Sequence, residues 1–78
     1  MSQVSIGDVR PRAQTALANS PIFELRDLHV GQERSSLLIS GSVSSFYHKQ
    51  LAQEVVRAVC KECNEFEIEV INSIRVHQ

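Results

Sequence analysis

The fold is decided by an alternating stretch near the end of the chain. Its residues are Phe66-Glu67-Ile68-Glu69-Val70-Ile71-Asn72-Ser73-Ile74-Arg75-Val76. The even-numbered positions are apolar except at Asn72, and the odd-numbered positions are polar or charged except at Ile71. Because successive side chains of a strand point to opposite faces, the pattern predicts one long, half-buried strand over residues 66–76.

An amphipathic helix is predicted just before this strand, over residues 46–62. Its expected apolar stripe recurs at helical spacing and is widened by two further residues. These residues are Tyr47, Leu51, Val55, Ala58 and Val59, with Ala52 and Val56 beside them. Ser44 or Ser45 is a suitable N-cap, because its hydroxyl can accept a hydrogen bond from the first turn. Asn64 is expected to end the helix, because Asn tolerates the left-handed conformation.

Two shorter alternating runs, 24–32 and 36–43, predict a β-hairpin whose turn is the polar segment 31–35. The inward positions are Leu28 and Val30 in the first run and Leu37, Ile39, Gly41 and Val43 in the second. Gly41 should either allow close approach of a helix or mark a bend in its strand.

A short first helix is predicted over residues 11–19, packed through Ala13, Ala16 and Leu17. Pro11 suits a helix start because its missing N–H would be unpaired there, and Pro21 ends the segment. Residues 1–9 are expected to form a flexible tail, and residues 10–78 a single domain.

The predicted element order is therefore α-β-β-α-β. A right-handed helical crossover makes the second and third strands parallel, with both helices on one face of a mixed three-stranded sheet, an α+β fold. The pattern leaves the strand orders 1-2-3 and 2-1-3 open. Asn72, polar on the inner side of its strand, is expected to bond to backbone at a sheet end or loop.

Composition restricts the function classes. The chain has 78 residues, 42% hydrophobic and 22% charged, with a formal net charge of −1. A chain this short buries only about 60% of its surface, so a deep active site would compete with the core for the same side chains. Near-neutral charge argues against a strongly basic nucleic-acid binder or a polybasic membrane anchor. The first ten residues lack a secretory signal pattern, so a cytoplasmic location is expected unless the domain comes from an exported parent.

The chemically reactive residues favour structural roles. Cys60 and Cys63 lie near the predicted helix C-terminus, where the dipole opposes thiolate formation, so a thiol-redox enzyme is the least favoured hypothesis. We expect one cysteine to be packed and the other partly exposed. A structural zinc site needs about four ligands, which two cysteines and the scattered histidines do not supply. We expect His29, His48 and His77 to be solvated surface histidines.

No catalytic group, metal or cofactor is predicted. Glu67 and Glu69 should lie on the outer face of the sheet, where charged residues ordinarily pair across strands. A K-homology fold would need a Gly-x-x-Gly loop to clamp phosphates, and no two glycines here have that spacing, so no nucleic-acid partner is expected.

Several local patterns together resemble the BON domain family, the module named after bacterial osmotic-stress and nodulation proteins. The central match is residues 37–45, a strand ending in Ser-Gly-x-Val and followed by a polar cap. Residues 70–76 are similar to the closing Val-x-Asn-x-Leu/Ile-x-Val, and residues 28–30 resemble the first strand. The motif positions that carry the resemblance are Gly41, Val43, Asn72, Ile74 and Val76.

One departure from the family concerns the loop before the last strand. The family usually has Gly-Val there, whereas residues 60–65 contain no Gly and appear longer. A bulge near Val70 and Ile71 is therefore expected.

The resemblance implies a non-catalytic binding module, with association to a phospholipid membrane surface or envelope component as the leading hypothesis. The alternative is a protein–protein interaction or homo-oligomerisation domain that uses the open sheet face. The oligomeric state is expected to be a monomer or a weak dimer. The candidate contact surface consists of Leu38, Ile71, Phe46 and Tyr47.

Overall fold

The computed structural model describes residues 6–63 and 67–77. Its helices are α1 (Ile6–Ala18), the 3₁₀ helix η1 (Phe23–Leu25) and α2 (Phe46–Glu62). Its strands are β1 (His29–Glu33), β2 (Ser36–Ser40), β3 (Ser42–Val43), β4 (Glu69–Asn72) and β5 (Arg75–Val76). The bounds predicted for the long helix, 46–62, are confirmed.

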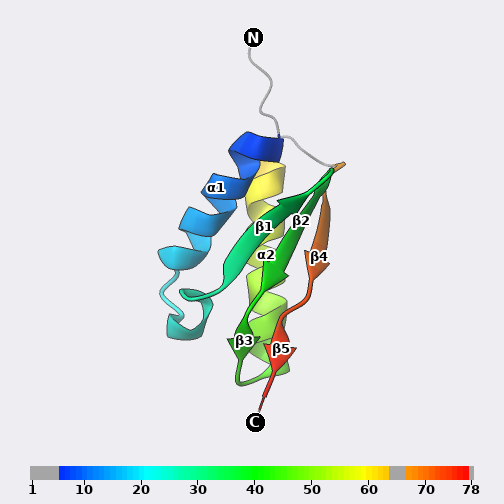
Figure 1. The fold of residues 1–78 in the computed structure, drawn as a ribbon. Coiled ribbons are helices and arrows are strands. Elements are labelled where there is room, and N and C mark those ends of the chain that lie inside the picture. Colours follow the sequence, from blue (N-terminus) through cyan, green and yellow to red (C-terminus); the bar gives the residue numbers. More distant parts are fainter. Residues whose placement is uncertain (1–5, 64–66, 78) are drawn as a thin grey trace.

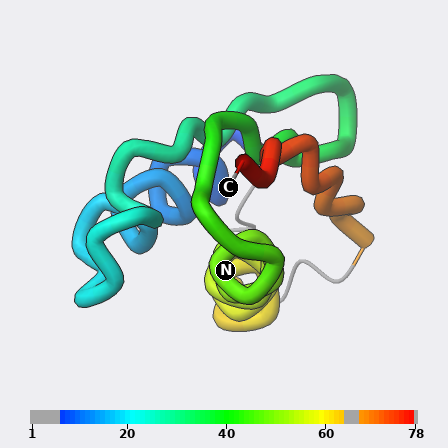
Figure 2. The backbone as a smooth tube through the Cα atoms, turned by 90° about the horizontal axis from the view of Figure 1, so that it is seen from below, coloured from blue at the N-terminus to red at the C-terminus, as the bar shows by residue number. Residues whose placement is uncertain are grey.

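The described strands form a mixed sheet of order β1-β2-β4, continued by the short pair β3-β5 (Figure 1). β1 pairs antiparallel with β2, and β2 pairs parallel with β4. The hairpin and crossover are therefore as predicted, and the order left open is settled as 1-2-3. Seen from below, α2 lies in a separate layer beneath the strands (Figure 2). The α+β fold with helices packed against one sheet is confirmed.

The core lies between the helices and the sheet. Each helix contributes small or branched side chains at i, i+4 and related positions, and the sheet contributes its inward residues. The residues with no or almost no exposed surface are Val9, Ala13, Leu17, Leu25, Leu28, Val30, Leu37, Ile39, Val43, Ala52, Val56 and Ile74. The predicted inner faces are thus confirmed for the described apolar residues of the three runs, whereas Gly41, predicted to face inward, is exposed.

One parallel register runs through both pairs of strands. Leu37 is opposite Val70 and Ile39 is opposite Asn72, and the same sequence offset places Val43 opposite Val76. The backbone ladder continues across the gap, because the Ser73 amide donates to the Ile39 carbonyl at 2.9 Å. The bulge expected near Val70 and Ile71 is therefore wrong, because a bulge would change the offset.

The interruption between β2 and β3 is a bend at Gly41. Its φ is +131°, a conformation that residues with a side chain rarely adopt. A Cβ atom there would lie 2.7 Å from Cδ2 of Leu28. The close neighbour is thus Leu28 before β1, not a helix, and both the bend and the close approach require glycine.

Asn72 connects the matching break between β4 and β5 to helix α2. Its Nδ2 donates to the Lys49 carbonyl at 2.9 Å and to the Gln53 side chain at 3.2 Å. Its Oδ1 accepts the Ile74 amide at 3.2 Å, within its own turn. The expectation that Asn72 bonds to backbone is confirmed. The single strand predicted over 66–76 is wrong in its continuity, because this turn separates β4 from β5, and residue 66 lies outside the described residues.

The start of α1 differs from the prediction. The helix begins at Ile6, not Pro11, so the tail predicted over 1–9 is wrong for residues 6–9, and residues 1–5 lie outside the described part. Val9 is fully buried one turn before Ala13 and extends the apolar stripe of the helix. Packing of Val9 therefore outweighs the loss of the backbone hydrogen bond that Pro11 cannot donate.

Two details of the hairpin and α2 also differ. The turn is only Arg34 and Ser35, with Arg34 at φ +57°, so Gly31 and its neighbours belong to β1 and not to the turn. The buried stripe of α2 is centred on Ala52, Val56, Val59 and Cys60, whereas Tyr47 and Ala58, predicted to be inward, are exposed. The helix is rotated toward its smaller side chains, which allow it to approach the sheet closely.

Replacing Gly41 with Ala should destabilise the domain strongly. The variant would hold a side chain at a positive φ and place its methyl group against Leu28, at an expected cost of about 1–3 kcal/mol or more in the free energy of unfolding. Gly31→Ala is the matched control, because its Cβ would meet no atom closer than 3.8 Å. Urea unfolding should show a change of about 0.5 kcal/mol or less for that control. Equal losses in the two variants would contradict the role assigned to Gly41.

Candidate functional site

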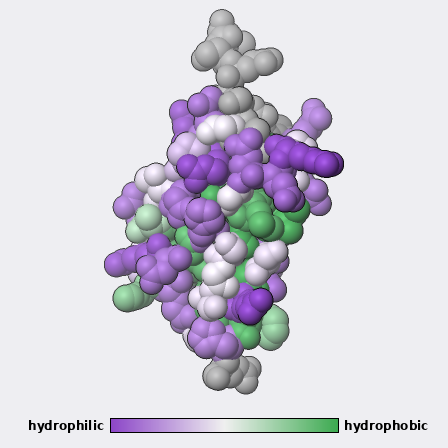
Figure 3. All heavy atoms as spheres, viewed as in Figure 1, coloured by the Kyte–Doolittle hydropathy of each residue, from purple (hydrophilic) through white to green (hydrophobic). Residues whose placement is uncertain are grey.

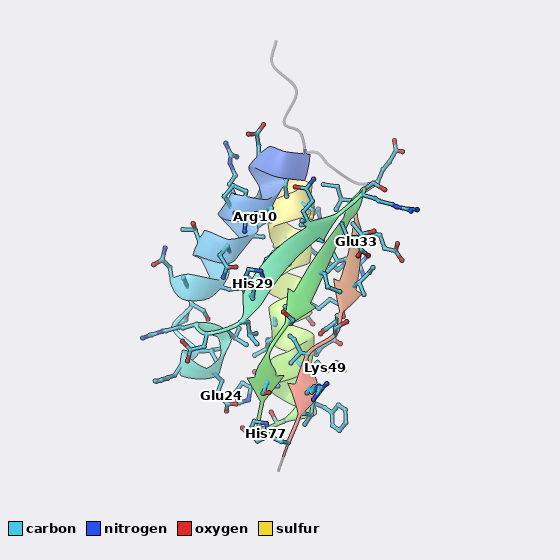
Figure 4. The ribbon with its side chains drawn as sticks, in the orientation of Figure 1. Arg10, Glu24, His29, Glu33, Lys49 and His77 are labelled. Atoms are coloured by element: carbon cyan, nitrogen blue, oxygen red, sulfur yellow. The ribbon has the colours of Figure 1, made fainter. Side chains whose placement is uncertain are left out.

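Helix η1, the turn between β3 and α2, and the C-terminal strand converge at one end of the molecule (Figure 1). Glu24 of η1 binds this turn with both carboxylate oxygens. Oε1 accepts the Ser44 amide at 2.6 Å, and Oε2 accepts the Ser44 hydroxyl at 2.5 Å. Figure 4 shows Glu24 and His77 at this same end. Glu24 therefore fastens the segment before β1 to the start of α2.

Ser45 caps helix α2. Its backbone is extended and its Oγ accepts the His48 amide at 3.2 Å. The same Oγ lies 2.8 Å from Nδ1 of His48, which is also 3.3 Å from Oε2 of Glu24. The sequence left Ser44 and Ser45 open as the N-cap, and in the structure the N-cap is Ser45. His48, predicted as a solvated surface histidine, is instead half-buried in this network.

A carboxylate, a histidine and serines here do not form a charge-relay arrangement. In such an arrangement the carboxylate and the hydroxyl contact different imidazole nitrogens, so that one orients the ring while the other gives up its proton. Glu24 and Ser45 instead both face Nδ1 of His48. The Ser45 hydroxyl is also engaged by the helix backbone. The network caps helix α2 and joins η1 to the turn before it, but it does not activate a nucleophile.

Glu24 is held in its charged form. Hydrogen bonds from the side chain and backbone of Ser44 lower the pKa of its carboxyl below the ordinary value, and His48 and His77 contribute smaller electrostatic effects. Desolvation acts in the opposite direction and is outweighed. The carboxylate therefore keeps its acceptor role at neutral pH.

Three large aromatic side chains project from this end, which we call the aromatic tip. Phe23 is 67% exposed, Phe46 70% and Tyr47 68%. The Glu24–Ser44 bonds join the two backbone segments that carry them, because Phe23 precedes Glu24, and Phe46 and Tyr47 follow the capped turn. The Arg26 guanidinium lies 5.8 Å from the Phe23 ring centroid, and the Tyr47 and His48 rings meet edge-on at 5.6 Å. The tip is apolar, with a cation beside it.

The four residues of the predicted contact surface fall into two places. Phe46 and Tyr47 belong to the aromatic tip, and both are exposed. Leu38 and Ile71 are a cross-strand pair on the open sheet face, where both are half-buried. Figure 3, which views this face, shows apolar side chains among polar ones over the sheet. The structure therefore contains two distinct surfaces.

The motif residues predicted from the BON resemblance have structural positions. Val43 and Ile74 are buried, Val76 packs partly against the core, and Gly41 and Asn72 shape the two breaks described above. None of these five lies in the aromatic tip. They determine the backbone path that leads to it.

Both cysteines are buried, so the expectation that one would be partly exposed is wrong. Cys60 is 5% and Cys63 8% exposed, and they are not joined by a disulfide. Arg12 of α1 donates to Sγ of Cys63 at 3.5 Å, which ties the end of α2 to α1. A shallow groove beside this contact is lined by residues of both helices, Pro11, Arg12, Thr15, Ala16, Val59 and Glu62. It contains no convergent set of reactive groups.

Within residues 6–63 and 67–77, no three His, Cys, Asp or Glu side chains are grouped as a metal site would require. His29 and His77 are exposed, as predicted. The predicted end of α2 at Asn64 lies outside the described residues; within them, the helix is capped at Cys63, whose amide donates to the Val59 carbonyl.

Sequence reasoning missed Glu24 and Phe23. It assigned them to the start of a strand or to the segment before it, whereas they form the 3₁₀ helix η1. The available signal was the break in alternation between Pro21 and Leu28, which is poorly explained by an extended strand.

The chain matches no protein-family model and no curated protein. The resemblance to the BON family therefore stays a prediction from the sequence. In the part of the chain that the structure describes, no helix has the length and hydropathy needed to cross a membrane.

The hydrogen bonds between Glu24 and Ser44 should make the free energy of unfolding depend on pH. Because the folded-state pKa is lowered, the unfolded chain binds this proton at higher pH than the folded chain does. The contribution of Glu24 is thus present above the ordinary pKa of an unfolded glutamate and is lost as pH falls through the lower folded-state pKa. Glu24→Gln should be less stable than the parent at neutral pH, and the difference should shrink on acidification.

The measurement is urea unfolding of both proteins at several pH values. Glu33→Gln is the control, because Glu33 is exposed at the far end of β1. A Glu24→Gln difference that stays constant down to acidic pH would show that the Glu24 carboxylate is not the titrating group.

Proposed function

We propose that this chain is a non-catalytic binding module of BON type that associates with a phospholipid membrane surface through its aromatic tip. The observation that carries the proposal is that Phe23, Phe46 and Tyr47, each about two-thirds exposed, lie on the two segments that Glu24 and Ser44 join at one end of the molecule. Large exposed aromatic side chains gathered in one region are typical of contact sites.

The chemistry of the tip suits the interface between lipid headgroups and acyl chains. Aromatic rings with an apolar body and a polar edge concentrate at this depth. Inserting one ring contributes about 1.5–3 kcal/mol when it leaves water completely, and less for partial insertion. Arg26, held beside Phe23, would meet the headgroup phosphates at the same depth. With a net charge of −1, binding should depend on ring insertion more than on anionic lipid.

The hydrogen bonds between Glu24 and Ser44 support the same proposal. They hold η1 and the start of α2 together, so the rings are presented on backbone that is already ordered. Pre-ordered contact residues lose less conformational entropy when they bind. The BON resemblance of residues 28–76 implies membrane attachment independently of this geometry.

An alternative use is protein–protein interaction through the open sheet face, and one specific observation favours it. Leu38 and Ile71 form an adjacent apolar pair there, beside Gly31, which has no side chain to cover them. The patch is smaller and more buried than the aromatic tip, so we rank it second.

Vesicle co-sedimentation distinguishes the two surfaces. The wild type should bind zwitterionic phosphatidylcholine vesicles at low and moderate salt, and the triple variant Phe23→Ser, Phe46→Ser, Tyr47→Ser should lose roughly tenfold or more in affinity. The matched control, Leu38→Ser with Ile71→Thr, removes two apolar side chains from the sheet face and should bind as the wild type does.

Far-UV circular dichroism should show that both variants keep the fold, because the replaced side chains lie outside the central core. No sedimentation of the wild type with neutral or anionic vesicles at low salt would reject the proposal. Loss of binding in the sheet-face control alone would move the site to the alternative surface.

A further inference from the structure

The two edges of the sheet differ in how their backbone groups are used. On the β1 edge, the Gln14 side chain of α1 accepts the Val30 amide at 2.8 Å and donates to the Leu28 carbonyl at 2.8 Å. Arg10, also of α1, donates to the Val30 carbonyl at 3.1 Å. These side chains occupy backbone groups of Leu28 and Val30, so a strand cannot pair along the first half of β1 without displacing α1. Gln32, whose backbone groups face the same edge by strand alternation, has no such cover among the described residues.

The β4 edge carries no comparable cover within the described residues. The amides of Glu69 and Ser73 point toward β2, so the alternation of a strand turns those of Val70 and Asn72 to the open side. Ile74, the next outward amide, is taken by the Asn72 side chain. Figure 1 shows no described element beyond β4. An uncovered strand edge with unpaired donors and acceptors is a template for another strand.

We propose that two copies of this chain associate through their β4 edges, antiparallel about a two-fold axis, to make one continuous sheet. The β4 edge of a second copy is the occupant that fits, because α1 covers the first half of β1 and a β4-to-β4 contact uses the same residues on both copies. Such an isologous contact closes as a dimer and leaves no free edge for further growth.

The charges and the apolar side chains of β4 and its neighbours favour one register between the β4 strands of the two copies. If Ile71 faces Ile71 of the second copy, Val70 and Asn72 form hydrogen-bonded pairs across the axis. Within β4 the odd-numbered side chains then share the outer face, and Ser73 comes level with Glu69 of the other copy. Arg75, after the break, is carried toward the acidic end of that copy, which holds Glu67 and Glu69. This arrangement brings the two Ile71 side chains together at the axis, with Leu38 of each copy one strand away from it, and places opposite charges toward both ends of the paired strands.

Sedimentation velocity over a concentration series tests the association. The wild type should show a reversible monomer–dimer equilibrium between about 10 µM and 1 mM, as expected for a small interface. Ile71→Lys places two like charges at the axis and should weaken the dimer roughly tenfold or more. Leu38→Lys is the matched control on the central strand, and it should leave the equilibrium within about twofold of the wild type.

A charge exchange tests the register. Arg75→Glu should weaken the dimer, because position 75 lies toward Glu67 and Glu69 of the other copy, and adding Glu67→Arg to the same chain should restore it. A wild type that stays monomeric at about 1 mM would overturn the proposal. Equal weakening by Ile71→Lys and Leu38→Lys would also overturn it, since that result indicates face-to-face packing.

Amide hydrogen exchange of the wild type gives a readout that does not depend on variants. The Val70 and Asn72 amides should exchange fast in dilute solution and become protected as the concentration rises, whereas the Ser73 amide should be protected throughout. Fast exchange of Val70 and Asn72 at every concentration would contradict the paired edge. Vesicle binding by the aromatic tip is independent of each of these outcomes, so this proposal and the proposed function fail separately.

Discussion

The parallel register between residues 36–43 and residues 69–76 is the constraint on which the rest of the structure depends. The same offset holds on both sides of Gly41 and of the Ser73–Ile74 break, so the two neighbouring chains bend together and the ladder continues. Asn72 secures this arrangement from the helical layer, because its amide reaches the Lys49 carbonyl of α2 and its oxygen accepts the Ile74 amide. A half-buried polar group that satisfies backbone in two layers fixes their relative position through directional hydrogen bonds, which apolar packing alone does not supply.

Both proposed contact surfaces follow from this arrangement. The bend at Gly41 directs the chain into β3 and then into the turn where Ser44 meets Glu24, so the aromatic rings on either side come to one end. The same register makes β2 the central strand and leaves β4 at the edge, while α1 covers the first half of the opposite edge through Gln14 and Arg10. One end of the molecule therefore presents apolar rings, and one side presents an open strand.

The fold could be predicted from the sequence because each element has a strong periodic signal and its burial agrees with that signal. The α2 bounds, the hairpin, the parallel crossover and the inner faces of the strands all followed from period and turn chemistry. The strand order and the break after Asn72 did not, because they depend on long-range contacts that no local pattern encodes. The helical turn before Pro11 was missed because a local rule about proline outweighed one buried valine, Val9. Half of the candidate site was predicted, Phe46 and Tyr47, but Phe23 and Glu24 came from a 3₁₀ helix that has no clear sequence period.

The most direct measurement of the shared register is a set of interstrand proton–proton contacts from nuclear magnetic resonance in solution. The account predicts cross-strand contacts between Ile39 and Asn72 before the break and between Val43 and Val76 after it, with the same offset in both. It also predicts contacts from the Asn72 side-chain amide protons to the Lys49–Gln53 turn of α2. An offset that changes by one residue between the two strand pairs, or an Asn72 amide without contacts to α2, would contradict it.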